Sequence, residues 1–236
     1  MTTFAPGLIC DLWKLWLPDF RVAFHQERPD WERGRLESVH ERLKPGMRVW
    51  DIGAEHGDFT ALYRSWGADV LPIEASPPYW PCIRRTFEAT SFVPPSAWFN
   101  GFAADTTRWR SGDFGRDGWP WCSEGPVVAD YGFRHLAQDL ETPRITLDAL
   151  ADLTAPPDAL MIDVEGAEHA VLTGARRVLA SGDVLVWVSV HEPTMLDWYG
   201  RTLDNLHALM ASVGYAGTLL PGHGEAEIFY LFERTP

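Results

Sequence analysis

The sequence has few cysteines, and they lack the spacing of a disulfide framework. Cys10, Cys82 and Cys122 lie far apart, and no Cys-x-x-Cys pair occurs. An odd number of widely spaced cysteines argues against paired disulfides. We therefore interpret them as reduced and mostly buried thiols, as is typical of a cytoplasmic protein.

Positive charge is scarce as well. The chain of 236 residues carries 20 Lys and Arg against 33 Asp and Glu, which gives a formal net charge of −13. A surface of this sign repels a phosphate backbone, so naked nucleic acid is not an expected partner. The hydrophobic content of 46% is sufficient for the core of one large α/β domain.

The N-terminus lacks the pattern of a secretion signal or a membrane anchor. It has no basic-then-apolar order, and the apolar stretch over residues 8–20 is interrupted by three charges and is too short to span a bilayer. We interpret this stretch as an amphipathic, tryptophan-rich helix within an N-terminal helical segment, residues 1–44. Core packing, a lid and a dimer contact are its alternative roles. We expect a cytoplasmic protein without a membrane partner, and a homo-oligomer is compatible with this organisation.

From about residue 47 onward, short apolar runs alternate with helical patterns, without repeats or low-complexity segments. This alternation is typical of βαβ units and a parallel sheet. Pro72 removes a ladder donor, so the strand that contains it is expected to be short or bulged. The expected strands cover residues 48–52, 69–74, 98–103, 159–163, 184–190 and 228–232, and the expected helices cover 58–66, 79–88, 170–178 and 201–213.

Residues 106–142 break this rhythm, because glycine and proline punctuate them densely. We interpret them as an irregular insertion within a domain that spans residues 45–236. Trp109, Trp119 and Trp121 offer flat apolar faces, so the insertion is a candidate binding surface for a substrate such as a sugar ring or an aglycone. Simple packing under a long loop is the alternative.

The loop after the first strand of this domain carries the strongest functional signal. Gly53 and Gly57 let the backbone turn tightly and approach a ligand. The loop lacks the G-x-G-x-x-G pattern that approaches a pyrophosphate, and Glu55 would repel one. Asp51, at the strand end, suits a cationic amine. The loop therefore favours S-adenosylmethionine (SAM) over a dinucleotide such as NAD.

Two further acidic residues extend this hypothesis. Glu74 ends the second strand about twenty residues later, where a carboxylate can accept both ribose hydroxyls; a surface glutamate is the alternative. Asp105, beyond the third strand, is a candidate for the adenine amino group, and a solvated loop aspartate is the alternative.

Polar residues also end the fourth and fifth strands. Ligands bind outside the carboxyl ends of strands in an open parallel sheet, and Asp163 and His191 lie at two such ends. Glu165 and Glu168 have a second explanation, since acidic residues favour the start of a helix. These donors suit Mg²⁺ or Mn²⁺, but nothing in the sequence fixes their geometry, and we favour no obligatory metal.

The chain resembles the FkbM-type methyltransferases of the class I SAM-dependent superfamily. The resemblance covers residues 45–192 and is most specific over 162–168. It implies a Rossmann-like α/β fold with a mostly parallel seven-stranded sheet, a reversed last strand and helices on both faces. It also implies SAM as methyl donor and O-methylation of a hydroxyl on a sugar or natural-product acceptor. The other matching segments are 49–60, 73–77, 146–150 and 171–175.

These arguments give two sets of candidate site residues. The cofactor-binding set is Asp51, Gly53, Ala54, Glu55, Gly57, Glu74, Ala75, Asp105 and Asp163; the catalytic set is Asp163, Glu165 and His191. We hypothesise that His191 or Asp163 is the general base, with a structural histidine as the alternative.

The chain departs from the family pattern at two positions. Glu55 stands where the family usually has asparagine, and Ser189 stands where it usually has an acidic residue. The remaining functional alternatives are a non-catalytic module that binds SAM or its product, and an NAD-dependent oxidoreductase.

Overall fold

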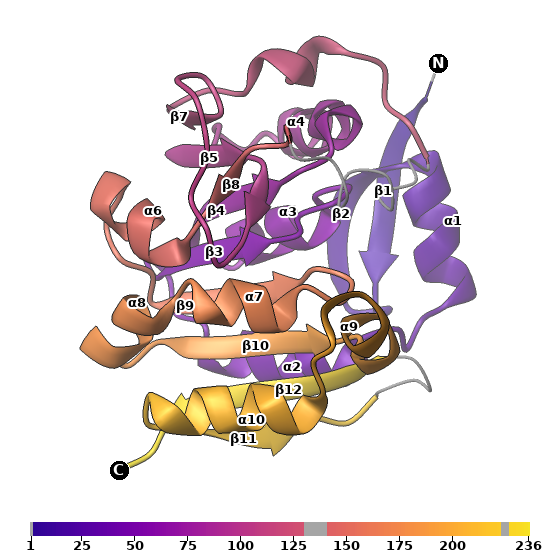
Figure 1. Cartoon of the computed structure of the whole chain (residues 1–236). Coiled ribbons are helices and arrows are strands. Elements are labelled where there is room, and N and C mark those ends of the chain that lie inside the picture. Colours follow the sequence, from indigo (N-terminus) through magenta and orange to yellow (C-terminus); the bar gives the residue numbers. More distant parts are fainter. Residues whose placement is uncertain (1, 130–140, 223–226) are drawn as a thin grey trace.

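The computed structural model describes residues 2–129, 141–222 and 227–236, and an eight-stranded sheet forms its centre (Figure 1). The strand order is β11-β12-β10-β9-β3-β4-β5-β7. In chain order, these strands are β3 (Arg48–Ile52), β4 (Asp69–Glu74), β5 (Ala97–Asn100), β7 (Phe114–Arg116), β9 (Ala159–Asp163), β10 (Leu185–Val190), β11 (Tyr215–Leu219) and β12 (Ile228–Arg234).

The sheet is mostly parallel, and its reversed last strand is confirmed. β3 pairs in parallel with both β4 and β9, and β9 pairs in parallel with β10. β12 runs antiparallel to β10 and β11. The expected number of seven strands is wrong, because β7, from the irregular insertion, adds an antiparallel edge strand next to β5.

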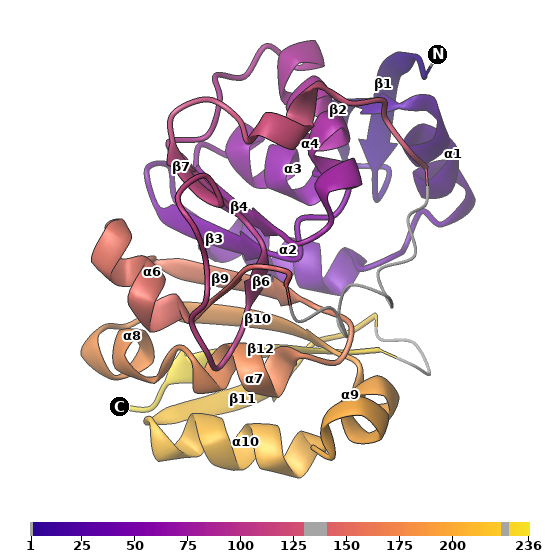
Figure 2. The same cartoon turned by 45° about the horizontal axis from the view of Figure 1, so that its top comes forward.

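Helices cover both faces of the sheet, as Figures 1 and 2 show. One core contains side chains of α6, α7, α8 and α10, and the other contains side chains of α2, α3 and α4. Alternate residues of each parallel strand enter opposite cores, as period-two geometry requires. The α-helices are α1 (Asp19–Glu27), α2 (Arg33–Arg42), α3 (Asp58–Ser65), α4 (Trp80–Ala89), α6 (Leu147–Leu153), α7 (Glu168–Thr173), α8 (Arg176–Ser181), α9 (Glu192–Tyr199) and α10 (Leu203–Ser212), and the 3₁₀ turns are η1 (Pro77–Tyr79) and η2 (Trp121–Glu124).

The expected amphipathic helix over residues 8–20 is wrong. The segment forms a β-hairpin of β1 (Phe4–Ile9) and β2 (Trp13–Pro18), with Cys10 and Asp11 in the left-handed conformation at the turn. The burial pattern explains why, since Leu15 and Leu17 are buried while Lys14 and Trp16 are exposed. This alternation has the period of a strand rather than that of a helix.

The rest of the N-terminal segment is helical and packs on the domain. Side chains of the hairpin and of α2 share one core with β3 and α3. Packing is thus one role of residues 1–44. The boundary at residue 45 between two parts of the chain stays a prediction.

Backbone contacts explain two differences from the expected elements. The expected strand over 98–103 divides at Gly101 into β5 and β6 (Phe102–Ala103), and β6 pairs with β8 (Arg144–Ile145) in a separate small sheet. The expected helix over 170–178 is interrupted at Gly174, where a Cβ would lie 2.0 Å from the Ala104 carbonyl oxygen. Pro72 does not shorten β4, and lies in register with Asp51 of β3.

A helix that crosses a bilayer needs about 20 predominantly apolar residues. Within residues 2–129, 141–222 and 227–236, no helix combines the length and the apolar composition that membrane crossing requires.

Candidate active site

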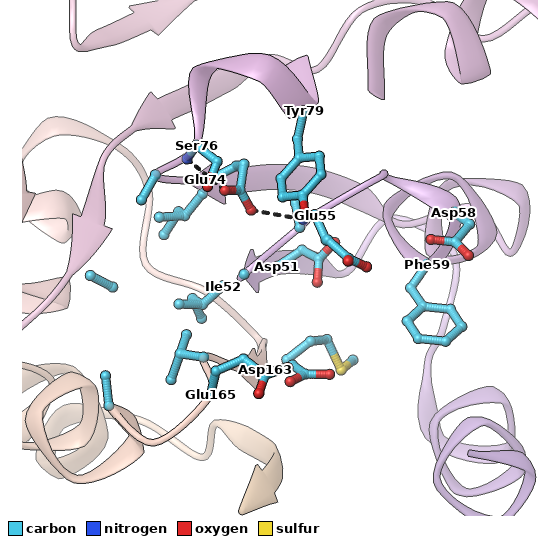
Figure 3. A pocket seen from close by; sticks show the side chains of 18 of the residues that line it. Asp51, Ile52, Glu55, Asp58, Phe59, Glu74, Ser76, Tyr79, Asp163 and Glu165 are labelled. Atoms are coloured by element: carbon cyan, nitrogen blue, oxygen red, sulfur yellow. Dashed lines mark hydrogen bonds between the residues drawn. The ribbon is translucent and has the colours of Figure 1, made fainter. Parts of the chain in front are cut away.

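A cavity of about 310 Å³ opens at the carboxyl ends of the parallel strands. This volume is at the lower end of the range for small-molecule sites, roughly 300–1,000 Å³. Its lining includes the predicted residues Asp51, Gly53, Ala54, Glu55, Glu74, Ala75, Asp163, Glu165 and His191. Figure 3 shows Asp51 between Glu74 on one side and Asp163 on the other. The structure therefore brings most of the predicted site residues together.

The loop between β3 and α3 needs its two glycines for close backbone packing. Gly53 has φ +87°, and a Cβ there would lie 1.8 Å from the Asp163 carbonyl oxygen. Gly57 has φ +78°, and a Cβ there would lie 2.9 Å from Ile83 Cα of α4. Gly53 lines the cavity, whereas Gly57 is absent from the lining that the described residues form. Gly57 thus fixes how α3 meets α4, rather than admitting a ligand directly.

Glu74 ties the loop to the end of β4. Its Oε2 accepts the Glu55 backbone N–H at 2.8 Å, and its Oε1 accepts the Ser76 backbone N–H at 2.6 Å (Figure 3). Burial raises the pKa of Glu74 to about 7 despite these bonds. Each oxygen keeps a further lone pair, so the predicted ribose contact is compatible with this arrangement.

Asp51 is a second buried carboxyl group on the cavity wall. It is 6% exposed, and Thr60 Oγ1 donates a hydrogen bond to its Oδ2. Burial raises the pKa of Asp51 to about 7, and the Thr60 bond only partly opposes this effect. A positively charged ligand beside Asp51 and Glu74 would stabilise their ionised, negatively charged forms.

His191 lies at the centre of a cluster of carboxylates. Its Nδ1 lies 2.9 Å from Oε1 of the fully buried Glu168. Its Nε2 faces Glu165 Oε2 and Glu227 Oε1, each at 3.6 Å, and Asp163 Oδ1 at 3.9 Å. Burial alone would lower the pKa of His191, but its bond to Glu168 and the charges of Asp163 and Glu165 outweigh burial and raise it to about 10. His191 is therefore an imidazolium at neutral pH.

The carboxylates of the cluster have the opposite perturbation. Burial raises the pKa of Asp163 and of Glu165, and it raises the pKa of Glu227 to about 7. The ligand atoms of Asp163, Glu165 and His191 lie within 4.8 Å of one another, as do those of Glu32, Asp163 and Glu227. Either group could hold a divalent cation. In the first, binding would have to displace the Nε2 proton of His191.

One buried ion pair connects α1 to the site, and a second lies within the N-terminal segment itself. Arg21 and His25 of α1 contact Asp58 Oδ2 at 2.6 and 2.7 Å, and Asp58 begins α3. Burial would raise the pKa of Asp58, but its charged partners outweigh that effect and hold it below its usual range. On α2, Arg35 pairs with Glu32. The N-terminal segment is therefore part of the cavity wall.

Several predicted site residues lie outside the cavity that the described residues form. Asp105 is exposed. Trp109 packs against Phe114, Trp119 packs edge-on against Phe87, and Trp121 is 75% exposed. The predicted adenine and acceptor contacts thus gain no support from this geometry. Residues 130–140 of the insertion lie outside the described residues.

Among the residues of the cavity wall that the sequence did not predict are Arg21, Phe24, Trp31, Arg35 and Glu227. A signal for Glu227 existed, because it precedes the reversed strand β12. The start of a reversed strand lies at the same sheet edge as the ends of its parallel neighbours. For the other four, the path of the N-terminal segment had to be known.

Known proteins are similar to this chain over most of its length. A family model described as the methyltransferase FkbM domain matches residues 51–216. Methyltransferase FkbM from Methylobacillus flagellatus KT has a similar structure, with a TM-score of 0.53 and 17% identity over 91% of this chain and 55% of that protein. The PH0226 protein from Pyrococcus horikoshii OT3 has a TM-score of 0.52 and 12% identity over 92% of this chain and 94% of that one. No curated protein matches the chain. At these identities, the solved structures show a shared Rossmann-like fold.

Proposed function

The chain belongs to the FkbM methyltransferase family, and on that premise we propose that it transfers a methyl group from SAM to a hydroxyl oxygen of a small-molecule or glycan acceptor. Within this proposal, Asp51, the loop at Gly53 and Glu74 hold the donor. Asp163 and the residues around His191 hold the reacting oxygen.

The observation that carries the proposal is the charge of the cavity. Asp51 and Glu74 are both buried in its wall, each with a pKa near 7 in the absence of a cation. Bringing a sulfonium or an ammonium group near them would favour their ionised forms. A pyrophosphate would have the opposite effect, so the geometry supports SAM over NAD. The close contact at Gly53 places the loop backbone beside Asp163, so the donor and acceptor halves adjoin.

SAM supplies an electrophilic methyl group on a sulfonium, which becomes a neutral thioether when the methyl leaves. The cavity walls orient the two reactants and exclude water, and alignment of this kind is worth on the order of 7–11 kcal/mol in favourable cases. The acceptor hydroxyl must also lose its proton as the new C–O bond forms.

We assign proton removal to Asp163 rather than to His191. His191 already holds a proton on each ring nitrogen at neutral pH, because its pKa is raised to about 10. Asp163 is half-buried with a raised pKa, which makes it a stronger base than an ordinary aspartate. The nearby positive charge of His191 opposes the effect of burial and so favours the ionised form of Asp163. The imidazolium also supplies the charge that a metal ion would bring to Asp163 and Glu165, so we propose a reaction without an obligatory metal.

Calorimetry with SAM, S-adenosylhomocysteine and NAD tests the donor site. We expect SAM and S-adenosylhomocysteine to bind and NAD not to bind. Asp51→Asn, which removes the ionisable carboxyl group at nearly constant shape, should weaken the binding of both SAM and S-adenosylhomocysteine, because both carry the ammonium group that Asp51 is proposed to hold. Asp204→Asn, at an exposed position on α10, is the matched control. Binding of NAD, or equal SAM affinity for Asp51→Asn and wild type, would contradict the proposal.

Transfer itself is then measured with methyl-labelled SAM. Label recovered in a product that survives mild alkali excludes a carboxyl methyl ester, which would be hydrolysed, and mass spectrometry of that product should place the methyl group on an oxygen. The variant Asp163→Asn should lose turnover by about 10²–10⁴-fold, the usual contribution of a general base, while it still binds S-adenosylhomocysteine. Turnover within about twofold of wild type would exclude Asp163 as the base.

A further inference from the structure

One side of the cavity is aromatic, and the N-terminal segment supplies most of it. Phe24 and Trp31 precede the region matched by the family model, and Phe59 belongs to α3. The Trp31 and Phe59 rings stack with centroids 5.4 Å apart, and the Phe24 ring meets Trp31 edge-on at 4.8 Å. All three side chains are half-buried, so part of each remains accessible at the cavity. We call these three residues the aromatic wall.

Buried guanidinium groups hold the aromatic wall in place. The Arg21 guanidinium lies 4.3 Å from the Phe24 ring centroid, and the Arg35 guanidinium lies 5.0 Å from that of Phe59. Both arginines are buried and paired with carboxylates. The rings are therefore positioned before any ligand arrives, which lowers the ordering cost of binding to them.

The aromatic wall is separate from the donor residues. In Figure 3, Phe59 and Glu74 lie on opposite sides of Asp51, and Asp163 and Glu165 lie below Asp51. A donor that extends from Asp51 to Glu74 would leave the side of Phe59 to the second reactant. The proposed base, Asp163, would then lie between the two.

The polar residues near the aromatic wall select against negative charge. Asp163, Glu165 and Glu227 converge within 3.9 Å of one cationic nitrogen, His191 Nε2. An anion placed there would face these three carboxylates, while Arg35, a further cation that acts on Asp163 and Glu227, is already paired with Glu32. A hydroxyl or an ammonium group would instead donate to the carboxylate oxygens.

We propose that the aromatic wall is the acceptor-binding surface, and that it admits ring-bearing acceptors that carry no negative charge. The inference rests on the proposed function, since it assigns the second reactant of the same reaction. It replaces Trp109, Trp119 and Trp121 as the candidate acceptor contacts. An aromatic face and convergent carboxylates together select a molecule with a flat apolar side and hydrogen-bond donors on its edge.

Three probes that differ mainly in charge test this selection. They are p-nitrophenyl β-D-glucopyranoside, p-nitrophenyl β-D-glucosaminide and p-nitrophenyl β-D-glucuronide. Saturation-transfer NMR is recorded on the full chain loaded with S-adenosylhomocysteine. We expect signals from the neutral and the cationic probe and none from the glucuronide. Equal binding of the glucuronide, or binding of none of the three, would overturn the inference.

Variants of the aromatic wall then locate the binding surface. Trp31→Leu keeps apolar bulk but removes the flat face, and Phe24→Ala opens the edge of the wall. Each variant should lower the affinity for the neutral probe by about 2- to 10-fold, as expected for loss of an aromatic contact. The affinity for S-adenosylhomocysteine should stay unchanged. Trp16→Ala, on the exposed face of the hairpin, is the control. Unchanged probe affinity in both wall variants, or a loss in Trp121→Ala instead, would overturn the inference.

The readouts separate this inference from the proposed function. If wild type does not bind S-adenosylhomocysteine, the proposed function fails, and the acceptor assignment fails with it. If that ligand binds but the probes do not respond as described, only the acceptor assignment fails. Retained S-adenosylhomocysteine affinity in the variants also shows that they are folded.

Discussion

The contact between Gly53 and the Asp163 backbone gives a prediction with a calculable size. Gly53→Ala places a Cβ at φ +87°, where a left-handed backbone costs a non-glycine residue about 1–2 kcal/mol. The same Cβ would lie 1.8 Å from a carbonyl oxygen, which no side-chain rotation relieves. β3 and β9 would have to separate by more than an ångström, and overpacking of this kind adds about 1–3 kcal/mol.

Gly46→Ala is a matched control for the backbone term. Gly46 has φ +86°, and no described residue lies within 4 Å of a Cβ built there. Gly46→Ala should therefore be destabilised only by the left-handed strain, which costs about 1–2 kcal/mol. In a chain of this size, each kcal/mol lowers Tm by about 2–4 °C, so Gly53→Ala should melt several degrees below Gly46→Ala.

Thermal unfolding followed by circular dichroism measures this difference, and calorimetry with SAM measures its effect on the site. We expect Gly53→Ala to bind SAM more weakly and Gly46→Ala to bind it as wild type does. Equal Tm values for the two variants would refute the packing argument. Undiminished SAM affinity in Gly53→Ala would refute the role of this contact in shaping the donor site.

Five further predictions concern the charges of the site. The affinity for SAM should rise from about pH 6 to about pH 8 in calorimetry, because Asp51 and Glu74 ionise near pH 7; a flat profile would contradict their raised pKa values. For the same reason, urea denaturation of the ligand-free protein should show stability falling as the pH rises from about 4, the pKa of unfolded carboxyl groups, through 7. His191→Gln should lower the urea midpoint at neutral pH and converge with wild type above about pH 10, since the stability from the imidazolium is complete below about pH 6.5 and lost as the pH rises through 10; a constant difference would argue against the charge. Asp58→Asn should lower the free energy of unfolding by about 3–5 kcal/mol, because it leaves Arg21 buried without its charged partner, and a loss below 1 kcal/mol would show that water reaches this pair. Treatment with EDTA should leave methyl transfer unchanged, and lost activity restored by Mg²⁺ would replace the imidazolium with a metal in the mechanism.

The parallel strands and the residues at their ends could be predicted from the sequence for a physical reason. A strand buried on both faces is a continuous apolar run, so the first polar residue after it is conspicuous. Asp51, Glu74 and Asp163 each end such a run, and parallel pairing brings them to one edge of the sheet. Glu227 could be placed at the same edge by the same reasoning, because it precedes the reversed last strand.

The N-terminal segment was mispredicted because its composition hides its period. Tryptophan at positions 13 and 16 imitates the spacing of a helix, yet Trp16 is exposed while Leu15 and Leu17 are buried. Phe24 and Trp31 lie at the cavity on a segment that the buried pair of Arg21 with Asp58, 37 residues away in the chain, joins to α3. No local pattern records such contacts, so the aromatic wall could be found only in three dimensions.

The pairing of Arg21 and His25 with Asp58 sets a minimum length for a working protein. A chain trimmed to the recognisable family region, residues 51–216, would retain Asp58 but lose both Arg21 and His25. Such a fragment would also end before Glu227 and would lack Phe24 and Trp31, two of the three residues of the aromatic wall. Domain borders taken from family resemblance alone would therefore remove most of the surface proposed here to bind the second reactant.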